Sequence, residues 1–459
     1  MRSRAASAKP GVSVLEQAEG IRGAQVTVTD TQSAEALAAA LAQLPAAAKQ
    51  EVGGHRTETF LDSDIIVLSP GVPPLPEVEA ARKRNITVTG ELELASWFVD
   101  APIVAITGTN GKSTTTTLCG AILAANGRPT FVGGNLGIPL AEAVGTPAAE
   151  QGGACVLEVS SFQLETVESF RPQVAVLLNI SPDHLDRHGT LEAYAATKAR
   201  IFAAQTSTDF AVINIDDPLV EAAAKGIRSQ GVLISTRRPL IVGGWIEGDA
   251  LCVRLMGGPI EYYPAHLLGL VGRHNLENAL AALVAGRLAG ALPAEARHAL
   301  LAFRPLAHRM ELVGELDGVL FYDDSKGTNV GAVVAALDRF PRPVVLIAGG
   351  RDKGGSYEPL AQVMKQAGRG AVLIGEAGPR LREALAPAVP VEIAGSMEEA
   401  VVQAATMARG GDAVLLSPAC SSFDMFRNYE HRAQVFRAAV NRLIALKRGE
   451  RGGLPEGSP

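Results

Sequence analysis

The chain lacks an excess of positive charge and any long apolar run. It has 42 lysine and arginine residues against 48 acidic ones, giving a formal net charge of −6 and a pI near 5.8. This balance offers no basic field for DNA or RNA, so we expect no nucleic-acid partner. No uninterrupted run of about 20 apolar residues occurs, so we expect no membrane span. The N-terminus has arginines but no apolar core with a cleavage pattern, which predicts no secretion signal and a cytoplasmic protein.

Cysteine is also scarce. The four cysteines lie far apart in the sequence, at Cys119, Cys155, Cys252 and Cys420. This usage is typical of free thiols in a reducing cytoplasm. No cysteine or histidine pair has the spacing of zinc ligands, so the sequence gives little support to a zinc site. Apolar residues make up 47% of the chain, which is ample for buried cores and argues against disorder.

Strand and helix signals alternate along the chain, a pattern typical of α/β domains with parallel sheets. The length of 459 residues suggests two to four domains. We expect three, over residues 1–100, 101–305 and 306–446. A helix over 429–446 closes the last domain, and the glycine-rich tail at 447–459 is predicted to be disordered.

A glycine loop at residues 108–114, GTNGKST, is the most informative motif. It follows an apolar strand predicted over 103–107 and precedes a helix predicted over 114–125. Gly108 and Gly111 let the backbone turn tightly, and Lys112 and the helix N-terminus attract anions. The Ser113 hydroxyl can hold Mg²⁺. The usual spacing would place glycine at Ile106, so this loop departs from the common pattern while still indicating ATP or GTP.

Two further strands end in polar residues. Glu158 follows an apolar run, and ligands of open α/β sheets lie at the carboxyl ends of strands, so Glu158 is a candidate Mg²⁺ ligand. His184 follows the next strand, among Asp183, Asp186 and His188, and could contact metal or substrate. Lys198 lies on a helix predicted over 191–204; by physics alone, such a lysine is usually a solvated surface charge.

Together these motifs resemble the Mur ligase family. The segments TGTNGKST, LEVSSFQLE, NISPDHLDRH, YAATKARIF, GRHNLENALAA, AHRMELV and DDSKGTN match the family in order and spacing, over about residues 23–445. Three features are similar to the D-glutamate-adding branch: serine after the loop lysine, the DSKGTN run, and SPACSSFDMFRNYEHR at 417–432. The DNPR motif of another branch is absent.

The resemblance implies a central P-loop-type, mostly parallel sheet flanked by Rossmann-like N- and C-terminal α/β domains. It also implies a reaction. ATP phosphorylates the carboxylate of UDP-N-acetylmuramoyl-L-alanine, and the amine of D-glutamate attacks the acyl phosphate. The expected cofactors are ATP and Mg²⁺ at two sites, with a CO₂-derived carbamate on Lys198 that would make it a metal ligand. We expect a monomer.

The same resemblance assigns site residues. Those for catalysis are Lys112, Glu158, His184 and Lys198. Those for ATP are Gly108, Thr109, Asn110, Gly111, Lys112, Ser113, Thr114, Asn275, Asn278, Arg309, Asp324 and Lys326. Those for the UDP-muramoyl substrate are Asp30, Thr31, Ser69, Pro70, Gly71, Asn135 and Gln163, and those for D-glutamate are Thr328, Lys353, Ser422, Phe423 and Tyr429. Those for metal are Ser113, Glu158, His184 and carbamylated Lys198.

Some of these residues have simpler explanations. Asn275 could cap a helix over 276–288, because asparagine is favoured at helix N-caps. Ser422 and Asp424 could cap the last helix. Arg309, Lys326 and Lys353 could be surface cations.

The first domain departs from the family pattern. Family members open with an apolar strand and a glycine-rich turn that grips the UDP pyrophosphate, whereas no such strand or turn is recognisable before Gln25. Gln32 also stands where an arginine is common. We therefore expect an incomplete N-terminal domain, with weaker binding of the UDP substrate and a preserved ATP site.

Two other functions stay open. One is a ligase similar to folylpolyglutamate synthetase, although that group typically has GTNGKGS where this chain has GTNGKST. The other is a nucleotide-binding protein with a degraded UDP site. The presence of Lys112, Glu158, His184 and Lys198 argues against the latter, because a scaffold needs no paired metal ligands.

Overall fold

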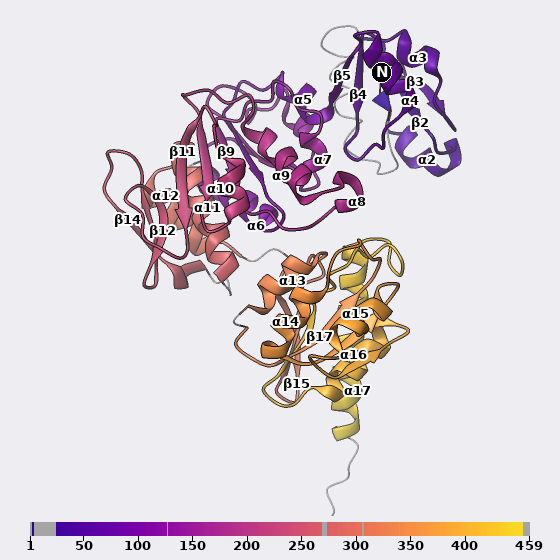
Figure 1. Cartoon of the computed structure of the whole chain (residues 1–459), viewed down its shortest axis with the longest axis vertical. Helices are drawn as coiled ribbons and strands as arrows, with labels where there is room; N and C mark the ends of the chain where they lie inside the picture. Colours follow the sequence, from indigo (N-terminus) through magenta and orange to yellow (C-terminus); the bar gives the residue numbers. More distant parts are fainter. Residues whose placement is uncertain are drawn as a thin grey trace, which may run out of the picture. The chain divides into compact units, whose positions relative to one another are not determined.

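A computed structural model describes residues 2–3, 24–125, 127–268, 273–304, 307–338 and 340–452. The described residues form three β-sheets of five, nine and six strands, each covered by helices (Figure 1). By contact density the chain divides into two units. The first comprises Met1–Ile180, Glu192–Leu268 and Glu277–Phe303, and the second Ser181–Leu191, Gly269–Leu276 and Arg304–Pro459. In the described ranges, none of the helices has the length and apolar character that crossing a membrane requires.

The N-terminal sheet is parallel, with strand order β3-β2-β1-β4-β5. Its middle position, where the sequence offers no apolar strand, is taken by only two residues, Arg2 and Ser3. The expected gap in this sheet is therefore occupied, although by a strand of only two residues. Residues 4–23, where the family's glycine-rich turn is missing from the sequence, lie outside the described residues. The elements are β1 (Arg2–Ser3), β2 (Thr27–Asp30), α2 (Ala34–Leu41), β3 (Lys49–Val52), α3 (Thr57–Leu61), β4 (Ile65–Leu68), α4 (Pro76–Lys83), β5 (Thr87–Gly90) and α5 (Glu91–Ser96).

The central sheet has the order β14-β13-β12-β11-β10-β9-β6-β8-β7, with only β13 and β14 antiparallel to their neighbours. Strands β6, β8 and β9 are buried along their whole length, as expected for parallel strands covered on both faces. From β6 to α9 the elements are β6 (Ile103–Thr107), α6 (Lys112–Ala124), β7 (Thr130–Gly134), η1 (Leu140–Ala143), β8 (Ala154–Glu158), α7 (Ser161–Leu164), β9 (Val174–Leu177), α8 (Leu185–His188) and α9 (Leu191–Ala199). They continue with η2 (Arg200–Phe202), β10 (Phe210–Asn214), α10 (Pro218–Ala223), β11 (Gln230–Ser235), β12 (Gly243–Glu247), β13 (Ala250–Arg254), β14 (Glu261–Pro264), η3 (Ala265–Leu268), α11 (Arg273–Leu288) and α12 (Pro293–Ala302).

The C-terminal sheet has the order β15-β16-β20-β17-β18-β19, with β15 antiparallel at one edge. Alternate residues of its strands face opposite layers. Leu346, Leu373 and Leu415 pack with α13, α14 and α15, whereas Ile347 and Val414 pack with α16 and α17. The elements are β15 (Glu311–Leu316), β16 (Val319–Asp323), α13 (Val330–Leu337), β17 (Val344–Gly349), α14 (Glu358–Ala367), β18 (Gly368–Ile374), α15 (Gly378–Leu385), β19 (Val391–Ile393), α16 (Met397–Met407), β20 (Ala413–Leu416) and α17 (Tyr429–Gly452).

The expected fold class is confirmed, and several local expectations need correction. Helix α17 continues to Gly452, so residues 447–452 of the expected disordered tail are helical, and 453–459 lie outside the described residues. Helix α11 begins at Arg273, so Asn275 lies inside it and is not its N-cap. Ser422 and Asp424 precede α17 by several residues, and Asn428 instead accepts a hydrogen bond from the backbone N–H of His431. The expected domain boundary at 305/306 falls on residues outside the described ranges.

A buried carboxylate joins the end of the first sheet to the central one. Glu93 on α5 is 1% exposed and accepts hydrogen bonds from the backbone N–H groups of Glu168, Ser169 and Phe170. Its other partners are the Trp97 indole and the Ser169 hydroxyl. Burial alone would raise the pKa of Glu93, but these hydrogen bonds outweigh it and hold the pKa below its usual value.

We predict that Glu93→Gln destabilises the protein by about 2–3 kcal/mol, because an amide NH₂ would face several N–H donors in a buried site. Urea unfolding of the purified protein measures the change. Glu168→Gln is the matched control, since that side chain is exposed and its effect should stay within about 0.5 kcal/mol. Equal stability of the two variants would contradict this anchoring role.

Candidate active site

The glycine loop connects β6 to the N-terminus of α6. Gly111 has φ = 85° and immediately precedes the helix, which begins at Lys112. A Cβ at Gly111 would lie 2.0 Å from the side-chain oxygen of Asn278, and one at Gly108 would lie 2.9 Å from the Leu178 Cβ. Both positions therefore require glycine, for conformation and for space. The helix starts two residues earlier than the sequence predicts, which brings Lys112 into its first turn.

Two lysines converge on one carbonyl of this loop. The Lys112 ammonium donates to the carbonyl oxygens of Gly108 and Thr109, each at 2.9 Å. The Lys198 ammonium donates to the same Gly108 oxygen at 2.9 Å and lies 4.6 Å from the ring centroid of Tyr194. Lys198 is only 1% exposed, so the interpretation of it as a solvated surface charge is wrong. Two cations held this close together favour an anion beside the loop.

A carboxylate faces the same helix terminus. The Ser113 hydroxyl donates to Glu158 at the end of β8, with an O–O distance of 2.6 Å. The other Glu158 oxygen accepts from the Asn135 side chain at 2.8 Å. Glu158 is 3% exposed. Hydroxyl and carboxylate oxygens are the donors that Mg²⁺ prefers, so Ser113 and Glu158 fit a magnesium ion.

Asn179 was not among the predicted site residues. Its side chain accepts from the Asn110 backbone N–H at 2.8 Å and donates to the Asn110 carbonyl at 3.1 Å. Its own carbonyl accepts from the Thr109 N–H at 2.9 Å. It therefore holds the loop in shape. The signal in the sequence was a polar residue directly after the apolar run 174–178, but nothing there indicated that it would contact residue 110.

In the N-terminal sheet, Asp30 ends β2 and is 1% exposed. One of its oxygens accepts from the Gln32 backbone N–H at 2.8 Å. The other is buried and has no hydrogen-bond partner among the described residues. A buried acceptor without a donor suits a ligand N–H. Thr31 is exposed, and Ser69, Pro70 and Gly71 form a turn after β4 in which the Val72 N–H donates to the Ser69 carbonyl.

Gln163 and Asn135 were both predicted to contact the muramoyl group. Gln163 takes part in a capping box with Ser160, accepting from its backbone N–H at 2.9 Å. Asn135 is bound to Glu158 by its side chain and by its backbone N–H. Each thus has a structural partner, and contact with substrate stays a prediction for both.

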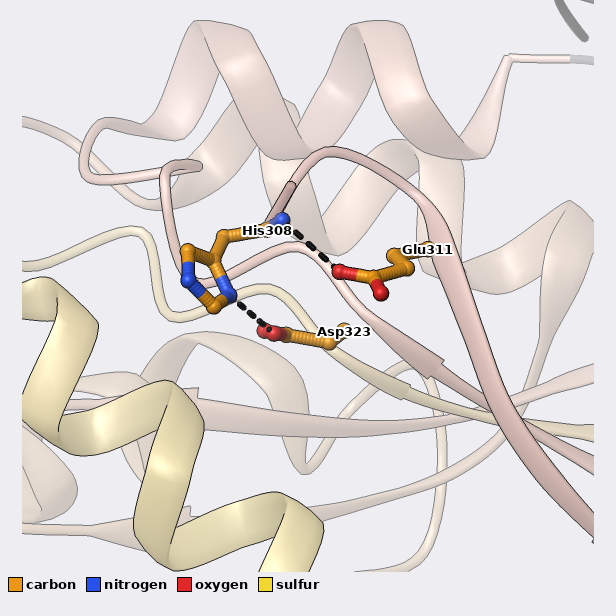
Figure 2. A group of neighbouring side chains, drawn as sticks. All are labelled: His308, Glu311 and Asp323. Atoms are coloured by element: carbon orange, nitrogen blue, oxygen red, sulfur yellow. Dashed lines mark hydrogen bonds and ion pairs between the residues drawn. The ribbon is translucent and has the colours of Figure 1, made fainter. Parts of the chain in front are cut away.

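In the second unit, His308, Glu311 and Asp323 gather at the start of the C-terminal sheet (Figure 2). The His308 ring nitrogen lies 2.7 Å from the Asp323 carboxylate, and the His308 backbone N–H donates to Glu311 at 3.1 Å. Glu311 also pairs with Arg437 at 2.8 Å, and Asp323 accepts from Ser325. Because these groups are satisfied by one another and by Arg437 and Ser325, we read the cluster as a hydrogen-bonded corner and not as a metal site.

Two predicted nucleotide residues adjoin this corner: Asp324 follows Asp323 in the sequence, and the Lys326 backbone N–H donates to the His308 carbonyl. The Lys326 ammonium sits 4.1 Å from the ring centroid of Tyr429, and the edge of that ring also packs near His308. Asp324 accepts from the Ser417 hydroxyl at 2.6 Å and is 6% exposed. Burial raises the pKa of Asp324 to about 7, and neighbouring Asp323 adds to the rise against the opposing effects of Ser417 and Arg309.

The predicted D-glutamate residues also lie in the second unit. Lys353 pairs with the Asp183 carboxylate at 3.1 Å, and Asn329, next to Thr328, donates to the other Asp183 oxygen at 3.1 Å. Ser422 is 3% exposed and Phe423 is 65% exposed.

The predicted site residues thus fall in both units. Lys112, Ser113, Glu158, Lys198 and Asn278 belong to the first, and His184, Asn275, Arg309, Asp324 and Lys326 to the second. His184 adopts a left-handed conformation with φ = 52° and precedes α8. That all these residues act on one ATP molecule stays a prediction.

The raised pKa of Asp324 predicts a pH-dependent stability. Between about pH 4 and pH 7 the folded carboxyl holds a proton that the unfolded chain has released, so stability falls as pH rises through this window. We predict that Asp324→Asn flattens this decline, by up to about 4 kcal/mol. Thermal unfolding at several pH values measures it. Asp338→Asn, at an exposed position, should keep the wild-type slope. Parallel profiles for wild type and Asp324→Asn would contradict the shift.

Comparison with known proteins matches the chain to three domain models of one family. The family model of the Mur ligase middle domain matches residues 106–286, the glutamate ligase domain model matches 308–420, and the N-terminal domain model of the MurD-like group matches 9–90.

Full-length relatives and solved structures agree with these matches. A UDP-N-acetylmuramoylalanine–D-glutamate ligase from Citrifermentans bemidjiense is 49% identical over 448 residues, covering 96% of this chain and 97% of the relative. A UDP-N-acetylmuramate-alanine ligase structure from Thermotoga maritima has a TM-score of 0.57 at 18% identity, covering 97% of this chain and 99% of that one. A MurF ligase from Thermotoga maritima in complex with ADP has a TM-score of 0.58 at 19% identity, covering 83% and 90%. The chain belongs to the Mur ligase family.

Proposed function

We propose that this protein is an ATP-dependent amide ligase that adds D-glutamate to UDP-N-acetylmuramoyl-L-alanine in peptidoglycan precursor synthesis. The observation that carries the proposal is the arrangement at the ends of β6 and β8. Lys112 and Lys198 both donate to the Gly108 carbonyl. Ser113, in the first turn of α6, donates to Glu158 at the end of β8. The 49% identity to a D-glutamate ligase over nearly the whole chain supports the choice of substrates.

The chemistry has two steps. An oxygen of the L-alanyl carboxylate attacks the γ-phosphorus of ATP, so that a new O–P bond forms and ADP leaves. The D-glutamate nitrogen then attacks the carbonyl carbon, loses a proton, and expels phosphate to leave an amide. In the first step two anions must approach each other, and the ammonium of Lys112 lowers the cost of bringing them together.

Ser113 and Glu158 would hold a Mg²⁺ ion, and we propose a second ion held by His184. The ion supplies charge neutralisation for the transferring phosphoryl group. Asn135 fixes the orientation of Glu158 by donating to its second oxygen. Asn179 holds the loop backbone that faces the phosphates. Asn278, whose amide lies against Gly111, would contact adenine with Asn275.

We further propose that Lys198 is carbamylated by CO₂. Lys198 is almost fully buried and reaches the Gly108 carbonyl of the phosphate loop, and carbamylation would turn its cation into an anion able to bind the second Mg²⁺ there. The Tyr194 ring and the Gly108 carbonyl border the position.

The amino-acid pocket is assigned to Thr328, Lys353, Ser422, Phe423 and Tyr429. Lys353 already pairs with a carboxylate, that of Asp183, which supports its ability to bind one of D-glutamate. Arg309, Asp324 and Lys326 would reach ATP from the same unit. Because acyl phosphates hydrolyse readily, we propose that the intermediate is shielded from water during turnover.

The UDP pocket would use Asp30, Thr31 and the Ser69–Gly71 turn. The buried Asp30 oxygen without a donor supports a contact with an N–H of the uracil base. We keep the expectation of weaker UDP binding, because Gln32 replaces a common arginine. The four cysteines are free and buried, which supports a cytoplasmic protein, and we propose that it is a monomer.

The assay that tests this function measures phosphate release with ATP and Mg²⁺. We predict release that requires both UDP-N-acetylmuramoyl-L-alanine and D-glutamate. Release with a folate acceptor and L-glutamate would select the folylpolyglutamate alternative. ATP binding without release in either mixture would select a nucleotide-binding protein with a degraded UDP site.

A second experiment tests the role of Lys198. We predict that Lys198→Ala lowers turnover by about a hundredfold or more, and that a short carboxylate such as formate restores part of it, since the missing group is an anion. Methylammonium should restore nothing. Lys225→Ala, which removes an exposed lysine, is the control. Unchanged turnover of Lys198→Ala, or rescue by methylammonium in place of formate, would remove the carbamate from the mechanism.

A further inference from the structure

Asp352 organises the loop that carries Lys353. Its carboxylate accepts from the Gly354 backbone N–H at 2.9 Å and from the Tyr357 hydroxyl at 3.0 Å. It also pairs with the Arg380 guanidinium, and its side chain is only 16% exposed. A carboxylate with two donors on one oxygen and Arg380 on the other fixes the turn in one conformation. The backbone of the next residue, Lys353, is therefore also held in place.

The Tyr357 hydroxyl has a second partner on another loop. It lies 3.3 Å from the Cys420 sulfur, and Tyr357 and Cys420 are 6% and 0% exposed. Because the Tyr357 O–H donates to Asp352, the Cys420 thiol is the donor in this second contact. Burial raises the pKa of Cys420 to about 11, so the thiol keeps its proton at neutral pH.

The two loops are adjacent along their backbones as well. The Arg351 N–H donates to the Ser421 carbonyl at 2.9 Å, and the two residues form an isolated β-bridge. Gly350 approaches the same carbonyl so closely that a Cβ there would lie 2.2 Å from the Ser421 oxygen. Lys353 and Ser422 therefore each lie within two residues of a direct link between the loops.

The Arg380 guanidinium contacts both Asp352 and Tyr357. It stacks 5.5 Å from the Tyr357 ring centroid while pairing with Asp352. The ring itself packs with Leu360 and Leu381 in the core of the domain. The aromatic body of Tyr357 thus contributes to stability, and only its hydroxyl joins Asp352 to Cys420.

We propose that the Tyr357 hydroxyl is a positioning group for the amino-acid substrate. By binding Asp352 and Cys420 together it sets the distance between Lys353 and Ser422, and so the affinity of the pocket for the dicarboxylate of D-glutamate. This inference rests on the proposed function. The hydroxyl would act through Asp352 and Cys420.

The test is Tyr357→Phe in the full-length protein, which keeps the ring and removes both hydrogen bonds. Phosphate release is measured with saturating ATP and UDP-N-acetylmuramoyl-L-alanine while D-glutamate is varied. We expect the KM for D-glutamate to rise by about five- to tenfold, the order expected for one or two lost hydrogen bonds. The kcat and the KM for ATP should stay within about twofold. Tyr322→Phe is the matched control, a tyrosine of the same domain whose ring packs on Phe340.

Cys420 supplies a second, independent arm. Cys420→Ala removes the thiol donor and should raise the same KM, whereas Cys420→Ser keeps a donor and should restore most of the affinity. The double variant Tyr357→Phe/Cys420→Ala should be less than additive, because both changes remove one shared contact. If Tyr357→Phe does not fold, the comparison of Cys420→Ala with Cys420→Ser tests the positioning role without it.

The outcomes separate this inference from the proposed function. A wild-type protein without D-glutamate-dependent phosphate release refutes the function, and the inference falls with it. An active wild type with an unchanged KM in Tyr357→Phe and Cys420→Ala overturns the positioning role alone. Equal changes in the KM values for ATP and D-glutamate would also overturn it, since they would indicate a general structural effect.

Discussion

The convergence of two lysine ammonium groups on the Gly108 carbonyl is the constraint on which the rest of the site depends. Lys112 reaches it from the first turn of α6 and Lys198 from the end of α9. Two cations in one small volume are costly unless anions approach or one cation is chemically converted. The positive charge beside the loop therefore favours the binding of an anion.

The central sheet explains how this convergence is built. β6, β8 and β9 are adjacent parallel strands, so their carboxyl ends carry the Gly108 loop, Glu158 and Asn179 to one edge. Ligands of open α/β sheets bind at that edge because helix N-termini and loop N–H groups also gather there. The C-terminal sheet likewise brings polar residues together at the carboxyl ends of adjacent parallel strands. Asp323 and Asp324 end β16 and follow it, and Ser417 follows β20, which pairs with β16.

Much of this could be predicted from the sequence, since strong signals are local. The strand over 103–107 matched β6 in both bounds, because a fully apolar run ended at a glycine loop. The family and the fold class followed from motifs in the right order. Lys198 could be assigned a role only through resemblance, because its burial results from packing between α9 and the loop and not from helical periodicity.

What the sequence did not predict depends on contacts between distant residues. Asn179 binds Asn110 across two strands, and the Tyr357 hydroxyl binds Cys420 across 63 positions. No local sequence pattern indicates either of these contacts. The end of α17 was misjudged because glycine suggested a helix stop, whereas the helix continues through Gly449. The two-residue β1 was missed because backbone pairing with β2 and β4, and not side-chain character, defines it.

We propose that phosphate is transferred from ATP to a carboxylate at the anion site beside Gly108. Oxygen-18 labelling of the L-alanyl carboxylate of the UDP substrate tests this transfer. Turnover with D-glutamate should move one labelled oxygen per cycle into the released phosphate, because the acyl phosphate forms through that oxygen. Phosphate free of label, with the displaced labelled oxygen recovered in water, would contradict it.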